Sequence, residues 1–185
     1  MKILIFSCGF IDYTIGLANS LSAKHEVRLC LPKNSIEDRY DETINDKIDF
    51  ISFDMPRHRS LHNIFLMRRI YKLIKAFNPE IIHLQSEGHL YFSILHPLLK
   101  DCKILNTVHD PKTHPGEKEN FIVKLLERFN SFFIDEYIVH GDNLKSELSK
   151  SRNIDYKKIS IINHGDYNLY HHWSKKKTKK ETATI

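Results

Sequence analysis

The amino-acid sequence predicts a doubly wound, Rossmann-like α/β domain, in which a parallel β-sheet carries helices on both faces. Short apolar runs alternate along the chain with longer segments whose apolar residues recur at i, i+3 and i+4 spacing. This alternation is typical of strands that are followed by amphipathic helices. Repeated β-α-β units of this length connect parallel strands, and right-handed crossovers place helices on both faces. The 185 residues, 41% of them hydrophobic, are enough for one domain with a core.

Seven strands and five helices are expected. In chain order they are strand Lys2–Ser7, helix Thr14–Lys24, strands Glu26–Leu31 and Phe50–Phe53, helix Leu61–Phe77, strand Glu80–Leu84, helix His89–Leu99, strand Lys103–Val108, helix Glu117–Ile134, strand Glu136–His140, helix Asn143–Ser151 and strand Lys158–Asn163. Pro32 ends the second strand, and Asn78-Pro79 ends the longest helix. Residues 34–47 are polar and weakly patterned, which predicts a connection with at most a short helix.

Charge and hydropathy limit the possible partners. Ser174–Ile185 contains five Lys and one Glu, so it supplies +4 of the net charge of +5. A basic tail without interleaved aromatic residues is typical of a solvated linker, so we expect no nucleic-acid partner. No segment approaches 18 uninterrupted apolar residues, and Met1–Phe6 runs into a strand pattern without a cleavage site. We therefore predict a cytoplasmic location.

Neither cysteines nor histidines predict a metal site. Cys8, Cys30 and Cys102 each lie in or beside an apolar run and are interpreted as small buried hydrophobes. The closest histidine pairs in the sequence are His109 with His114, His58 with His62, and His171 with His172. None of these pairs has the Cys or carboxylate companions of a zinc site. We therefore predict no metal and no cofactor.

The segment Ile104–Gly116 is the strongest indication of a functional site. His109 and Asp110 follow a predicted buried strand at its carboxyl end, where open α/β sheets bind ligands. Pro111 stops the strand. The alternatives are that His109 satisfies a local carbonyl group and that Asp110 forms an Asx turn.

Polar or aromatic residues also follow three other predicted strands. Gly9 and Phe10 follow the first strand, Ser86 and Glu87 follow the fourth, and His140 follows the sixth. The carboxyl ends of parallel strands lie at one edge of a sheet, so these residues should converge with His109. For Ser86 and Glu87 the alternative is that they cap the helix expected from His89.

Several short motifs occur in a particular order along the chain. They are M-K-I-L-I at the start, L-A-N-S-L followed by H-E-V, P-E-I-I-H with Ser86, T-V-H-D at 107–110, Y-I-V at 137–139 and I-I-N-H-G at 161–165. Together they resemble the amino-terminal half of a GT-B glycosyltransferase of the retaining family 4 group, over residues 1 to about 170.

This resemblance implies a two-domain enzyme that transfers a sugar from a nucleotide sugar to a glycan or lipid-linked acceptor. The acceptor belongs to the first half and the nucleotide sugar mainly to the second, where a helix N-terminus holds the diphosphate without a metal. Residues 1–170 are then the acceptor-side domain, and residues 171–185 a basic linker and the start of a missing second domain. We expect this chain alone to transfer no sugar.

The resemblance also implies roles for individual residues. His109 is the expected catalytic residue, since it would approach the transferred sugar. The expected acceptor-binding residues are Phe10, Ser86, Glu87, Asp110 and His140. Gly9 is the expected donor-binding residue, although relatives carry paired glycines where this chain has one.

Two questions stay open. Leu61–Phe77 places Arg68, Arg69, Lys72 and Lys75 mostly opposite the apolar residues Ile64, Phe65, Met67, Ile70, Tyr71, Ile74 and Phe77. This pattern fits an ordinary sheet-covering helix or a peripheral contact with an anionic membrane. The chain as a whole also fits a stand-alone Rossmann-type binding or regulatory subunit. A dinucleotide oxidoreductase is disfavoured because no G-x-G-x-x-G follows the first strand.

Overall fold

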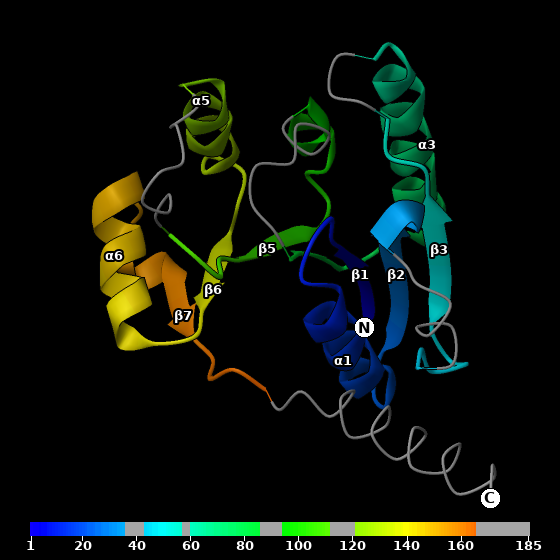
Figure 1. Cartoon of the computed structure of the whole chain (residues 1–185), viewed down its shortest axis with the longest axis horizontal. Coiled ribbons are helices and arrows are strands. Elements are labelled where there is room, and N and C mark those ends of the chain that lie inside the picture. The colour runs from blue at the N-terminus through cyan, green and yellow to red at the C-terminus, as the bar shows by residue number, and fades with distance from the viewer. Residues whose placement is uncertain (36–42, 57–59, 86–93, 112–120, 166–185) are drawn as a thin grey trace, which may run out of the picture.

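The computed structural model describes residues 1–35, 43–56, 60–85, 94–111 and 121–165. Its centre is a seven-stranded, all-parallel sheet in the order β3-β2-β1-β4-β5-β6-β7 (Figure 1). The strands are β1 (Lys2–Phe6), β2 (Glu26–Pro32), β3 (Asp49–Phe53), β4 (Ile81–Leu84), β5 (Lys103–Thr107), β6 (Glu136–Val139) and β7 (Ile159–Ile161). The predicted Rossmann-like fold class is confirmed, and each predicted strand lies within two residues of its observed bounds.

Four α-helices and three short 3-10 helices accompany the sheet in the described part of the chain. They are α1 (Ile11–Ser22), η1 (Lys33–Ser35), α3 (His62–Phe77), η2 (His96–Leu98), α5 (Phe121–Asn130), α6 (Asp142–Arg152) and η3 (Tyr156–Lys158). The helix expected at His89–Leu99 lies partly outside the described residues, and its described end contains η2 with Pro97. None of the described helices is long and apolar enough to cross a membrane.

Helix α1 begins at Ile11, three residues before the predicted start. Phe10 precedes it in a left-handed conformation, with φ 52°. The backbone N–H and the hydroxyl group of Thr14 both donate to the carbonyl oxygen of Phe10, at 2.9 and 2.8 Å. The chain therefore turns sharply after β1, and Phe10 stays 52% exposed at the start of the helix.

The alternating residues of β1 belong to two hydrophobic clusters. Ile3 and Ile5 pack in a cluster with residues of α1, whereas Leu4 and Phe6 pack in a cluster with residues of α3. Phe6 is fully buried and stacks on Phe53 of β3, with ring centroids 5.1 Å apart. Both faces of the central strand are thus covered, which explains its continuous apolar sequence.

The three cysteines are free thiols. Cys30 is buried, whereas Cys8 and Cys102 are half-buried. Burial raises the pKa of both Cys8 and Cys30 to about 12. Such thiols stay protonated at neutral pH and are poor nucleophiles, in agreement with their interpretation as small hydrophobic residues.

The strand order fixes where a ligand site is expected. The order reverses between β1 and β4, and the connections from these two strands leave in opposite directions. Open α/β sheets bind ligands at this switch point, beyond the carboxyl ends of the strands. A ligand site is therefore expected among the residues that follow β1, β4, β5 and β6.

Candidate functional site

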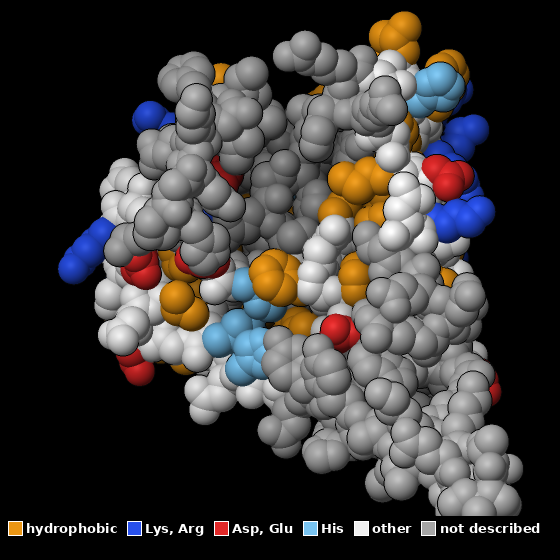
Figure 2. All heavy atoms as spheres, viewed as in Figure 1, with side chains coloured by type: hydrophobic (Ala, Val, Ile, Leu, Met, Phe, Trp, Pro, Cys, Tyr) orange, Lys and Arg blue, Asp and Glu red, His pale blue; other side chains and the backbone are white. Residues whose placement is uncertain are grey.

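Five aromatic rings meet at this edge of the sheet and form what we call the ring cluster: Phe10, Tyr13, His109, His140 and His164. Phe10 stacks on His109, with ring centroids 3.9 Å apart and planes inclined by 20°. Tyr13 contacts the three histidines at centroid distances of 5.2, 5.3 and 4.7 Å. Figure 2 shows histidine side chains gathered on one face of the molecule beside hydrophobic ones. Residues up to 154 positions apart in the sequence thus share one surface.

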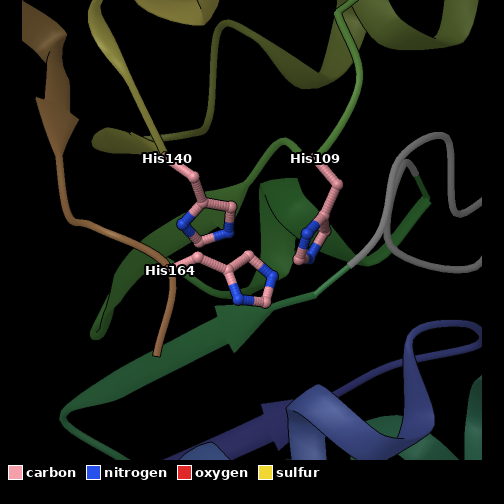
Figure 3. A group of neighbouring side chains, drawn as sticks. All are labelled: His109, His140 and His164. Carbon is pink, nitrogen blue, oxygen red and sulfur yellow. The ribbon is translucent and has the colours of Figure 1, made fainter. Parts of the chain in front are cut away.

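Each ring of the cluster is placed by the end of a strand or the start of a helix. Phe10 and Tyr13 belong to the turn after β1 and the first turn of α1. His109 and His140 follow β5 and β6, and His164 follows β7. Figure 3 shows the three histidine rings facing a common space from these different segments. This convergence follows from the parallel topology, since all of these strands end at the same edge.

A buried polar network lies beneath His109. Gln85 is fully buried, and its side-chain Nε2 donates to Nε2 of His83 at 3.0 Å and to Oγ1 of Thr107 at 3.2 Å. The Thr107 hydroxyl group lies 2.8 Å from the same His83 nitrogen. Gln85 Oε1 accepts a hydrogen bond from Nε2 of His109 at 3.3 Å. This bond puts the His109 proton on Nε2 and leaves the lone pair on Nδ1.

His140 is held by the segment after β7. Its Nδ1 donates to the carbonyl oxygen of Ile162 at 2.9 Å, so the lone pair of the neutral ring lies on Nε2. That Nε2 atom is buried and has no hydrogen-bond partner among the described residues. Buried polar atoms are normally paired, so this nitrogen is a candidate for contact with a ligand.

The environment keeps the rings of His109 and His140 neutral at physiological pH. Burial, together with the neighbouring His140, His164 and His83, lowers the pKa of His109 to about 4. Burial also lowers the pKa of His140, against the opposing effect of its bond to Ile162. A neutral imidazole has both a donor and an acceptor nitrogen, which suits the recognition of hydroxyl groups.

Two deeper histidines should make the fold sensitive to acid. Burial lowers the pKa of His83 and His96 to about 4, whereas an unfolded histidine titrates near 6.5. As the pH falls, these histidines therefore bind protons in the unfolded state at a higher pH than in the folded state. The stability that each of these two neutral, buried histidines contributes is fully present above about pH 6.5 and is lost as the pH falls toward 4. At about pH 5, the loss is on the order of 2 kcal/mol for each histidine. Urea unfolding at about pH 7.5 and about pH 5 measures this loss.

The variant His83→Gln should show a smaller loss of stability between these two pH values than the parent chain. Glutamine does not titrate, so only the contribution of the substituted histidine disappears. A parent chain whose unfolding free energy is the same at both pH values would contradict the assignment.

The structure brings together three of the seven residues that the sequence selects. Phe10, His109 and His140 lie in the ring cluster, so the expected convergence is observed for them. Asp110 is exposed beside His109. Ser86 and Glu87 lie outside the described residues.

Gly9 lies in the turn next to Phe10. Its N–H donates to Oγ of Ser7 at 3.2 Å, and its carbonyl oxygen accepts a hydrogen bond from the same hydroxyl group. Among the residues that the structure describes, a Cβ atom at Gly9 would meet nothing within 4 Å, so the space above the residue is open on their side. An approaching ligand would therefore meet open backbone rather than a packed side chain.

Tyr13, Gln85 and His164 belong to the site but are not selected by the sequence analysis. Gln85 follows β4 directly and could be found from the carboxyl-end rule that selects Ser86. His164 lies in the I-I-N-H-G motif, where it counts only as part of the resemblance. Tyr13 was not selected because the predicted helix begins at Thr14, whereas α1 begins at Ile11 and contains Tyr13.

The fold and the ring cluster together define a class of protein. A doubly wound parallel sheet with a polar, ring-lined edge at its switch point is the arrangement of a Rossmann-like ligand-binding domain. Residues 12–165 match Glycosyltransferase Family 4. The chain belongs to this family. No curated protein sequence matches the chain significantly.

Solved structures with the same fold are much longer than this chain. A glycosyltransferase from Rickettsia africae is 19% identical, with a TM-score of 0.62, and the match covers 89% of this chain and 42% of that one. The Neisseria meningitidis UDP-GlcNAc 2-epimerase bound to UDP-GlcNAc is 13% identical, with a TM-score of 0.65, and the match covers 100% of this chain and 54% of that one. Anabaena Alr3699/HepE in complex with UDP is also 13% identical, with a TM-score of 0.65, and the match covers 90% of this chain and 44% of that one. The chain thus has the fold of about half of a GT-B protein.

Proposed function

We propose that this chain is the acceptor-side domain of a glycosyltransferase that moves a sugar from a nucleotide sugar to a glycan or lipid-linked acceptor. The match of residues 12–165 to Glycosyltransferase Family 4 carries the proposal. Relatives of the same fold are described in complex with UDP or UDP-GlcNAc, which supports a nucleotide sugar as donor. The donor site lies mainly in a second domain outside residues 1–170, and residues 171–185 lead into it.

His109 is the proposed catalytic residue. Its Nε2 is occupied by Gln85, so Nδ1 accepts a hydrogen bond from a hydroxyl group of the transferred sugar. Phe10 covers one face of the ring at 3.9 Å and limits its rotation. A polar group fixed in this way stabilises a transition state without reorganising, which is the usual source of electrostatic catalysis.

The other residues of the proposal bind substrates around this ring. The buried Nε2 of His140 accepts a hydrogen bond from an acceptor hydroxyl group. Asp110 is exposed and accepts from a second hydroxyl group, while the exposed ring of Phe10 packs against a sugar face. Ser86 and Glu87 contribute further polar contacts. The open space above Gly9 lets the donor phosphates approach.

The isolated chain is expected to bind nucleotide sugars with Kd values of about 1 mM or weaker and to transfer no sugar. The reason is that the contacts with the nucleotide belong to the second domain. Such a Kd corresponds to only about 4 kcal/mol of binding free energy. Isothermal titration calorimetry with a panel of UDP- and GDP-sugars measures it. Micromolar binding by residues 1–185 alone would place the donor site in this domain instead.

Helix α3 is the proposed contact with a membrane that carries the acceptor. Its buried face consists of Leu66, Ile70, Ile74, Phe77 and Asn63. Ile64 and Phe65, which the sequence groups with the apolar side of this helix, are 59% and 72% exposed, next to the exposed Arg68 and Arg69. Figure 2 shows basic and hydrophobic side chains close together in this region. Apolar and basic residues on one surface helix favour an anionic bilayer.

Vesicle flotation tests this contact. The chain should float with vesicles that contain anionic lipid and not with neutral ones, and Phe65→Ser should reduce the bound fraction. Equal flotation of the parent chain with both kinds of vesicle would contradict an electrostatic contact. The cytoplasmic location that the sequence suggests stays a prediction.

Two alternatives are separated by product analysis. The fold is shared with UDP-GlcNAc 2-epimerases, so epimerisation of a nucleotide sugar is the second candidate. A stand-alone binding or regulatory subunit is the third. With the complete protein and a nucleotide sugar, a glycosylated acceptor supports transfer, an epimerised donor supports the second candidate, and binding without either product supports the third.

A further inference from the structure

His109, His140 and His164 form a compact group of nitrogen ligands. Each ring offers one nitrogen, and these nitrogen atoms all lie within 4.8 Å of one another. Figure 3 shows the three rings turned toward the space between them. A tetrahedral ion with bonds of about 2.0–2.1 Å holds its ligand nitrogens about 3.4 Å apart. Side-chain rotations that bring the nitrogens closer by about 1.4 Å or less are therefore enough to close the group around an ion.

The hydrogen bonds of the three rings indicate which nitrogen of each neutral ring carries the lone pair. His109 Nε2 donates to Gln85, His140 Nδ1 donates to the Ile162 carbonyl oxygen at 2.9 Å, and His164 Nδ1 donates to the Gly165 carbonyl oxygen at 3.0 Å. The lone pairs are then on His109 Nδ1, His140 Nε2 and His164 Nε2. Histidines that bind metals usually donate their other ring N–H to a carboxylate, a backbone carbonyl oxygen or water, as His140 and His164 do here with backbone carbonyl oxygens.

We propose that His109, His140 and His164 bind a divalent transition-metal ion of the Zn²⁺ type, with a fourth position open to water or an oxygen ligand. Three imidazoles without a carboxylate favour zinc, cobalt, nickel or copper over magnesium and calcium. The ion joins the ends of β5 and β6 to the segment after β7. It therefore fixes this segment, from Ile162 to Gly165, against the sheet edge.

The metal site does not depend on the proposed glycosyltransferase function. A bound ion occupies His109 Nδ1, the atom that we propose for contact with the sugar. The two roles of this ring therefore exclude each other, and excess Zn²⁺ is expected to inhibit transfer in the complete protein. Metal binding itself is measured on residues 1–185 without any substrate.

Cobalt titration tests the site. Co²⁺ in a four-coordinate site with nitrogen ligands gives visible absorption bands that hexaaquacobalt lacks, and the parent chain should show them with one equivalent bound. Zn²⁺ should displace the cobalt and raise the melting temperature. His140→Ala and His164→Ala should each weaken cobalt binding at least tenfold and remove the absorption bands.

His62→Ala is the matched control. His62 is exposed on α3 and bonds with Ser60 through its Nδ1 atom, so its loss also removes one histidine but leaves the ring cluster intact. Circular dichroism checks that every variant is folded. The proposal is overturned if the parent chain shows no stoichiometric binding, or if His62→Ala weakens binding as much as His164→Ala does.

Discussion

Replacement of His109 by alanine is expected to lower the turnover of the complete, two-domain protein by roughly ten- to a thousand-fold. This is the scale for the loss of one positioned polar group in a transition state. The ring is only partly buried at the edge of the sheet, so the melting temperature should change little. Initial rates with saturating donor and acceptor measure kcat, and thermal unfolding of the same samples measures stability.

His62→Ala serves as the control for this variant as well, because it removes an exposed histidine of α3 that is not part of the ring cluster. It should leave both kcat and the melting temperature unchanged. If His109→Ala is as active as the parent protein, His109 is not the catalytic residue. A large loss of stability would instead indicate that His109 has a structural role.

The fold was predictable because its strongest signals are local. The apolar run of β1 is buried on both faces, and the helices show a clear helical period. The ends of helices were harder to predict where the backbone conformation of a single residue determines them. The start of α1 depends on the left-handed conformation of Phe10, and non-glycine residues rarely adopt that conformation. Periodicity also could not show that Ile64 and Phe65 are exposed near the start of α3.

Site residues could be predicted only where their position at the end of a strand is sufficient to place them at the site. Phe10, His109 and His140 all follow strand ends, so the parallel topology alone brings them to one edge. Gln85 and His164 also follow strands, but their roles depend on side-chain direction. The link from Gln85 to His109 requires β4 and β5 to be neighbours in the sheet. The three-histidine group requires β5, β6 and β7 to be adjacent, and the spacing of histidines in the sequence does not show this.

Replacement of Gln85 by methionine is expected to destabilise the chain and to impair His109 at the same time. Gln85 is fully buried, and the apolar side chain leaves His83, Thr107 and His109 without its hydrogen bonds. His83 and Thr107 keep the hydrogen bond between them. A polar group that loses its buried partner costs about 1–3 kcal/mol, so we expect a loss of about 1–3 kcal/mol in urea unfolding. His109 also loses the bond that fixes its proton on Nε2, so kcat of the complete protein should fall roughly tenfold.

A stability loss alone does not show that Gln85 positions His109, so the control must be equally destabilised. Leu84→Ala removes a buried neighbour that packs in the hydrophobic cluster with α3, and such truncations cost about 2–5 kcal/mol. This variant should lose stability but keep kcat at temperatures where it is folded. If Gln85 acts through His109, the double variant Gln85→Met/His109→Ala should be no slower than His109→Ala alone. Multiplied losses in the double variant would show that the two residues act independently, and Gln85 would then have only a structural role.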